Sequence, residues 1–126
     1  MSKQITIAVD AMGGDNSPNK VIDGIIHHNK KNKNCFYKIF GDEVKIKKCL
    51  GSNLNQNSYE IFHTIEKIEG TDSPLGAAKK GKNTSMWLAI ESVKNKEADI
   101  VVSAGNTGAL LVIAKLNLTM IENIDK

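Results

Sequence analysis

Runs of β-branched and apolar residues alternate along this chain with segments that have helical spacing. Four runs have the composition of strands: 5–9, 35–40, 58–65 and 99–103. Helices are predicted from near Pro18 onward, over 43–50, over 84–95 with Asn83 as the N-cap, and after residue 108. Strands that alternate with helices pack as a mostly parallel sheet covered by those helices. The sequence therefore predicts an α/β fold.

Composition narrows the class of protein. A chain of 126 residues suits one domain over 1–126, and 40% hydrophobic residues are enough for a core. A net charge of +3 is too small to predict nucleic-acid binding, although it favours an acidic partner. Cys35 and Cys49 lack metal-site spacing, and no apolar run reaches the roughly 18 residues of a membrane span. We expect reduced thiols and a cytoplasmic location.

Two glycine-containing loops follow predicted strands. The first covers residues 10–18 (DAMGGDNSP) and the second covers 103–108 (SAGNTG). In parallel sheets, ligands bind at the carboxyl ends of strands, where glycines allow close approach and free helix amides attract anions. The two loops are therefore predicted to line one pocket. The alternative is that the glycines only make tight turns and that Asn106 and Thr107 only cap the helix.

Nucleotide-binding motifs are a poor match. Residues 76–83 (GAAKKGKN) approach a P-loop, but Asn83 occupies the position of the magnesium-binding hydroxyl and no strand precedes the segment. Neither glycine loop contains the G-x-G-x-x-G pattern of dinucleotide-binding folds. Neither nucleotide hydrolysis nor a nicotinamide cofactor is expected.

The two loops carry a family resemblance. Residues 8–15 (AVDAMGGD) with Pro18, and residues 103–110 (SAGNTGAL), resemble the two signatures of the PlsX family, the acyl-carrier-protein:phosphate acyltransferases of bacterial phospholipid synthesis. Residues 72–74 (DSP) and 82–86 (KNTSM) are similar to the segment between those signatures. The resemblance implies a fold like that of the isocitrate and isopropylmalate dehydrogenases without their redox chemistry. It also implies a homodimer.

The activity implied by the resemblance is transfer of a fatty acyl group from acyl carrier protein to inorganic phosphate, giving acyl phosphate. Its partners would be acyl carrier protein and phosphate, with no cofactor, metal ion or nucleic acid. Asn106 and Asp10 are the predicted catalytic residues. Asp10 and Asp15 either orient other groups or act as a base, and a capping or turn role is an equal alternative for both. The predicted substrate- and phosphate-binding residues are Gly13, Gly14, Asp15, Lys79, Lys82, Ser85, Ser103, Gly105, Thr107 and Gly108.

The sequence also departs from the family pattern. Lys79 replaces the usual arginine, and Asn83 and Thr84 replace the usual aspartate and serine. Family chains are more than twice as long and carry a membrane-associating region downstream, so an incomplete fold is expected. The apolar helix after residue 108 should then be left partly bare, and the chain should self-associate or bind a second polypeptide. A non-catalytic binding module and a decayed remnant remain alternatives to an enzyme.

Overall fold

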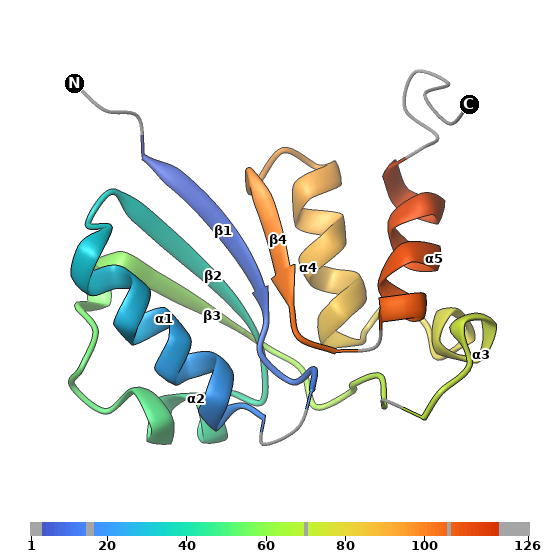
Figure 1. Cartoon of the computed structure of the whole chain (residues 1–126), viewed down its shortest axis with the longest axis horizontal. Helices are drawn as coiled ribbons and strands as arrows, with labels where there is room; N and C mark the ends of the chain where they lie inside the picture. The colour runs from blue at the N-terminus through green and yellow to red at the C-terminus, as the bar shows by residue number, and fades with distance from the viewer. Residues whose placement is uncertain (1–3, 15–16, 70, 106, 119–126) are drawn as a thin grey trace.

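The computed structural model describes residues 4–14, 17–69, 71–105 and 107–118 (Figure 1). In chain order the elements are β1 (Ile5–Asp10), α1 (Asn19–Lys31), β2 (Cys35–Gly41), α2 (Glu43–Leu50), a 3₁₀ turn (Gln56–Ser58), β3 (Tyr59–His63), α3 (Pro74–Lys79), α4 (Ser85–Lys94), β4 (Ile100–Ser103) and α5 (Thr107–Leu118). The predicted strands and longer helices are all present. None of the helices in the described part of the chain is long and apolar enough to cross a bilayer.

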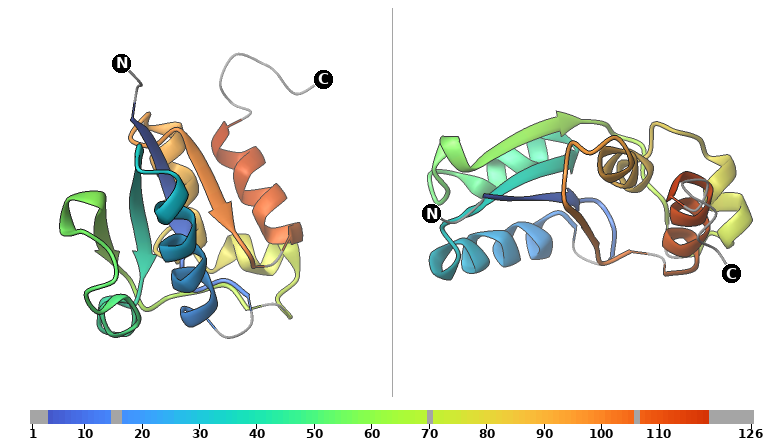
Figure 2. Two further views of the ribbon diagram at one scale, coloured as in Figure 1. Left: turned by 60° about the vertical axis from the view of Figure 1, so that its left-hand side comes forward. Right: turned by 90° about the horizontal axis from the view of Figure 1, so that it is seen from above.

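The four strands form one parallel sheet in the order β3-β2-β1-β4. Helices α1 and α2 cover one face, and α4 covers the opposite face (Figures 1 and 2). This arrangement confirms the predicted α/β class. Because β1 lies between β2 and β4, Asp10 at its carboxyl end is in register with Phe40 on one side and Ser103 on the other.

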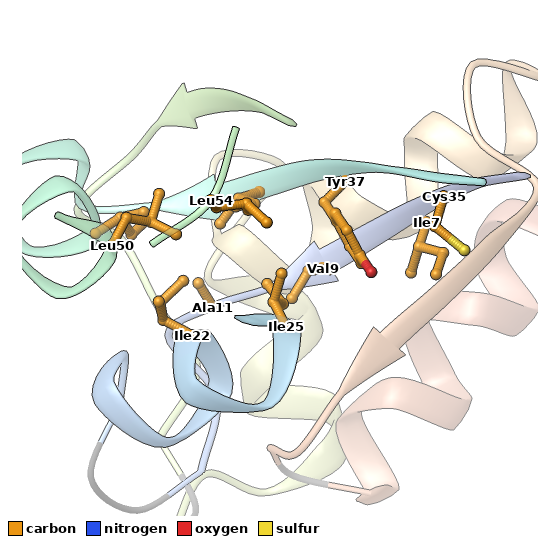
Figure 3. Close-up of a cluster of buried hydrophobic side chains, with 11 residues drawn as sticks. Ile7, Val9, Ala11, Ile22, Ile25, Cys35, Tyr37, Leu50 and Leu54 are labelled. Carbon is orange, nitrogen blue, oxygen red and sulfur yellow. The ribbon is translucent and has the colours of Figure 1, made fainter. Parts of the chain in front are cut away.

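The core between α1 and the sheet explains why β1 and α1 adopt these structures. Ile22 and Ile25 share one face of α1 and point toward Val9 and Ala11 at the end of β1 (Figure 3). All four side chains are buried. Each large aliphatic side chain in such a position contributes about 1.5–3 kcal/mol through removal from water. This packing fixes the path of the loop that joins β1 to α1.

A second cluster joins α3, α4 and α5. Trp87 of α4 is buried there with Ala77 of α3 and with Ala109 and Ile113 of α5. Helices α3 and α4 pack against α5, which the sequence predicted to be left partly bare. Among the α5 residues whose burial is described, Ala109 and Ile113 are buried, and Gly108, Leu110, Val112 and Ala114 are half-buried. Helix α3 was not predicted, although Ser73 caps it and Pro74 occupies its first turn.

The N-cap of α4 is Thr84, so the prediction that Asn83 caps this helix was wrong. Thr84 has extended backbone angles, and its Oγ1 accepts a hydrogen bond from the Trp87 amide at 3.3 Å. The Asn83 carbonyl instead accepts a hydrogen bond from the Thr64 hydroxyl. Asn83 therefore ties the start of α4 to the segment after β3 through its backbone, and Thr84 provides the cap.

Replacement of the cap distinguishes these two positions. We predict that Thr84→Ala lowers the free energy of unfolding by about 1 kcal/mol, because the first turn of α4 loses its side-chain acceptor. Asn83→Ala, which leaves the backbone carbonyl in place, should change it by less than about 0.5 kcal/mol. Urea denaturation measures both values, and a larger loss in Asn83→Ala would contradict the assignment.

Candidate functional site

A buried carboxylate lies at the centre of the predicted site. Asp10, at the end of β1, is 1% exposed. Its Oδ1 accepts hydrogen bonds from the Ser85 hydroxyl at 2.6 Å and the Met12 amide at 3.1 Å, and its Oδ2 accepts one from the Ser103 hydroxyl at 2.8 Å. Because a buried charge is costly unless it is well hydrogen-bonded, these donors stabilise the carboxylate. Asp10 thereby joins the first loop, the start of α4 and the end of β4.

The two glycine loops also touch directly. A Cβ atom added to Gly13 would lie 2.8 Å from Asp10 Oδ2 and 3.0 Å from the Gly105 Cα. The reverse contact, from a Cβ on Gly105 to the Gly13 Cα, would be 3.1 Å. Gly14 has a φ of +83°, and a Cβ there would lie 2.8 Å from the Ala104 carbonyl oxygen. These glycines therefore permit a backbone approach that other residues would prevent.

Two serines hold the loops in these conformations. The Ser103 hydroxyl accepts a hydrogen bond from the Gly105 amide at 3.1 Å while donating to Asp10. The Ser17 hydroxyl contacts the Gly13 and Gly14 carbonyl oxygens, the latter at 2.9 Å. Ser17 was not among the predicted site residues, although its position three residues after Gly14 suits a side chain that folds back onto the loop. Because the Gly105 amide donates to the Ser103 hydroxyl, it already has a hydrogen-bond partner within the protein.

The remaining predicted residues fall into three groups. Lys79, at the end of α3, and Lys82 are both exposed. Gly108 lies half-buried in the first turn of α5, which Thr107 begins. Asn106 and Asp15 lie outside the described residues. The structure thus brings together Asp10, Gly13, Gly14, Ser85, Ser103 and Gly105.

A neighbouring ion pair orders the segment that leads into α3. Lys80 Nζ lies 2.7 Å from the Asp72 carboxylate. This contact lowers the pKa of Asp72 below its ordinary value, and the Glu69 amide, which donates to the same carboxylate at 2.7 Å, adds to the effect. Asp72, part of the DSP motif, therefore fixes the turn before α3.

A concave surface of about 590 Å³ opens beside the loops. It lies between α1 and β4, and Asp10, Gly13, Gly14, Ser103 and Ala104 line its polar end. The rest of the lining includes Ile7, Val9, Val21, Ile25, Ile100 and Val102. No group of three metal-ligating side chains occurs among the residues that the structure describes. What the arrangement offers is loop backbone, hydroxyls, the Asp10 carboxylate, an apolar wall and, from α1, the side chains of Lys20 and His28.

Comparison with known proteins gives consistent matches along the chain. A family model described as "Fatty acid synthesis protein" matches residues 5–126. A protein named phosphate acyltransferase from Pelagibacter ubique is 69% identical over all of this chain, which covers 38% of that relative. Proteins of the same name from Rhodospirillum rubrum and Streptococcus mutans are 41% and 44% identical over 100% and 95% of this chain, which covers 36% and 35% of them. The chain thus spans little more than a third of the length of these relatives.

Two alanine substitutions test the close approach of the loops. We predict that Gly13→Ala lowers the free energy of unfolding by about 1–3 kcal/mol, because the new methyl group overlaps Asp10 and the Gly105 backbone. Gly24→Ala is the matched control, because a Cβ there meets nothing within 4 Å and α1 should gain about 0.5–1 kcal/mol from helix propensity. Thermal or urea unfolding measures both. Equal effects of the two substitutions would contradict the predicted contact.

Proposed function

Because this chain belongs to the fatty acid synthesis protein family, we propose that it forms the loop-bearing part of an enzyme that transfers a fatty acyl group from acyl carrier protein to inorganic phosphate. The observation that carries the proposal is that Asp10, at the start of the first glycine loop, accepts hydrogen bonds from Ser103, at the start of the second, and from Ser85 of α4. These are the segments in which backbone amides can surround an anion at the carboxyl end of a parallel sheet.

The chemistry explains what such loops would do. A phosphate oxygen attacks the thioester carbonyl, the new C–O bond forms, and the C–S bond breaks to release the carrier-protein thiol. Phosphate is already anionic at neutral pH, so positioning and electrostatic stabilisation serve this reaction better than a covalent enzyme intermediate. The enzyme must therefore hold phosphate and stabilise the oxyanion that develops on the carbonyl.

We assign these tasks to different loop residues. Gly13 and Gly14 from the first loop, with Thr107 and Gly108 at the start of α5, would supply amides for phosphate, and Asn106 would donate to the oxyanion. The Gly105 amide is engaged with Ser103, so its part is to allow the close approach of the loops. Asp10 is a positioning residue in this proposal, because its carboxylate is buried and hydrogen-bonded to Ser85 and Ser103.

The share of its relatives that the chain covers is relevant to whether it acts as an enzyme or as a binding module. Since it spans 35–38% of its relatives, we propose that turnover requires the rest of such a chain, either in the same polypeptide or in a second one. Acyl carrier protein, a homo-oligomer, a cytoplasmic location and peripheral membrane contact belong to the proposal for the complete enzyme. On its own, this part would act as a binding module for phosphate or carrier protein.

The test uses this chain continued into the rest of the Pelagibacter relative as one polypeptide, assayed for acyl phosphate formation from acyl carrier protein and phosphate. Asn106→Ala should lower kcat by about 10²–10³, the usual effect of removing one oxyanion donor. Gly105→Val should abolish turnover, because its side chain would overlap Gly13. Val44→Ala, at a 73% exposed position of α2, is the control and should retain activity. Full activity in both loop variants would contradict the proposal, and the 126-residue chain alone should show little turnover.

The exposed lysines are tested in the same assay. We propose that Lys79 and Lys82 attract phosphate or the acidic carrier protein, so charge reversal to glutamate should raise the KM of the substrate that they attract. The effect should shrink with added salt, because exposed charges are screened beyond about 10 Å at 0.1 M. Lys48→Glu, on the exposed surface of α2, is the control. A salt-independent effect would contradict this role.

A further inference from the structure

Strand β4 is paired on one side only. It pairs with β1 through Ile7–Asp10, and no other described strand pairs with it. Its two residues that face the α1 side of the sheet, Ile100 and Val102, are 49% and 48% exposed. Parallel strands are ordinarily covered on both faces, and an open apolar edge promotes association with another strand. Strand β4 therefore has both an unpaired edge and an uncovered apolar side.

The cavity beside β4 shows where further structure would lie. Apolar side chains of β1, β4 and α1 form most of its wall, Lys20, His28 and Tyr37 also line it, and its volume is about 590 Å³. Gly24 of α1 lines it, and a Cβ at this position would meet no atom within 4 Å. We call this cavity and the adjacent unpaired edge of β4 the β4 groove.

We propose that the β4 groove is the docking surface for the polypeptide that corresponds to the rest of the relatives' chains. One strand of that polypeptide extends the sheet beside β4, and an apolar segment fills the space over Gly24. The Pelagibacter relative has 100 − 38 = 62% of its length beyond the matched part, enough to supply both. A fatty acyl chain is the less suitable occupant, because it cannot hydrogen-bond the free backbone groups of β4.

Cysteine accessibility tests this proposal directly. Val102→Cys is placed in the groove and Val44→Cys, which replaces a 73% exposed residue of α2, is the matched control. Both are made with Cys49→Ser, which leaves the buried Cys35 as the remaining native thiol. Maleimide labelling, mapped by mass spectrometry, is compared between the 126-residue chain and the same chain continued into the rest of the Pelagibacter relative.

The proposal predicts that the thiol introduced by Val102→Cys reacts at least about tenfold more slowly in the longer chain, while the thiol introduced by Val44→Cys reacts at the same rate in both chains. Equal rates for the groove thiol in the two chains would overturn it. Protection of the groove thiol that requires added decanoate would identify an acyl occupant and would also overturn it. Protection in the shorter chain that rises with its concentration would indicate a second copy, with the same consequence.

Filling the groove gives an independent readout. Gly24→Leu should leave the 126-residue chain stable but destabilise the longer chain, because the new side chain occupies the space that the docked segment needs. Asp23→Leu adds the same side chain at a neighbouring exposed position outside the groove lining and should affect both chains alike. Equal melting shifts for the two variants in the longer chain would overturn the proposal without bearing on acyl transfer.

Discussion

The buried carboxylate of Asp10 is the interaction on which the arrangement of this site depends. It accepts hydrogen bonds from the loop after β1, from the first residue of α4 and from the last residue of β4. Removing the carboxylate would leave the hydroxyls of the buried Ser85 and the half-buried Ser103 without this acceptor, which is most costly at Ser85. The position of β1 inside the sheet, between β2 and β4, is what allows one side chain to reach all three segments.

The close approach of the glycines follows from this connection. Once Ser103 is held against Asp10, the backbone that continues from it passes within contact distance of Gly13. Side chains at Gly13 or Gly105 would separate the loops and weaken the hydrogen bonds to Asp10. Gly13, Gly105 and the Asp10 carboxylate therefore act together to hold the two loop backbones at one edge of the sheet.

Much of this fold was predictable, because the strands are β-branched and the longer helices have clear apolar faces. Helix α3 was missed because its six residues are too few to show a period, although Ser73 and Pro74 signal its start. Thr84, and not Asn83, caps α4, and this depends on backbone angles that the sequence does not reveal. The contact between α3 and α5 was missed together with α3 itself.

Part of the site was predictable from the geometry of parallel sheets. Strand ends in a parallel sheet meet at one edge, so the two loops were expected to lie together. The sequence did not predict that Ser85 and Ser103 are the partners of Asp10. They lie 75 and 93 residues away along the chain, and no local spacing connects them to it. Nor did the sequence show that the Gly105 amide donates a hydrogen bond to the Ser103 hydroxyl.

The most direct test of the role of Asp10 is a double-mutant cycle between Ser85→Ala and Ser103→Ala in urea unfolding. These two serines are connected through the same carboxylate, so their effects on the free energy of unfolding should be non-additive by about 0.5–3 kcal/mol. In Asp10→Asn, which weakens the shared acceptor, the coupling should fall. Additive effects in the cycle would show that Ser85 and Ser103 act separately and would contradict the account of a site organised by Asp10.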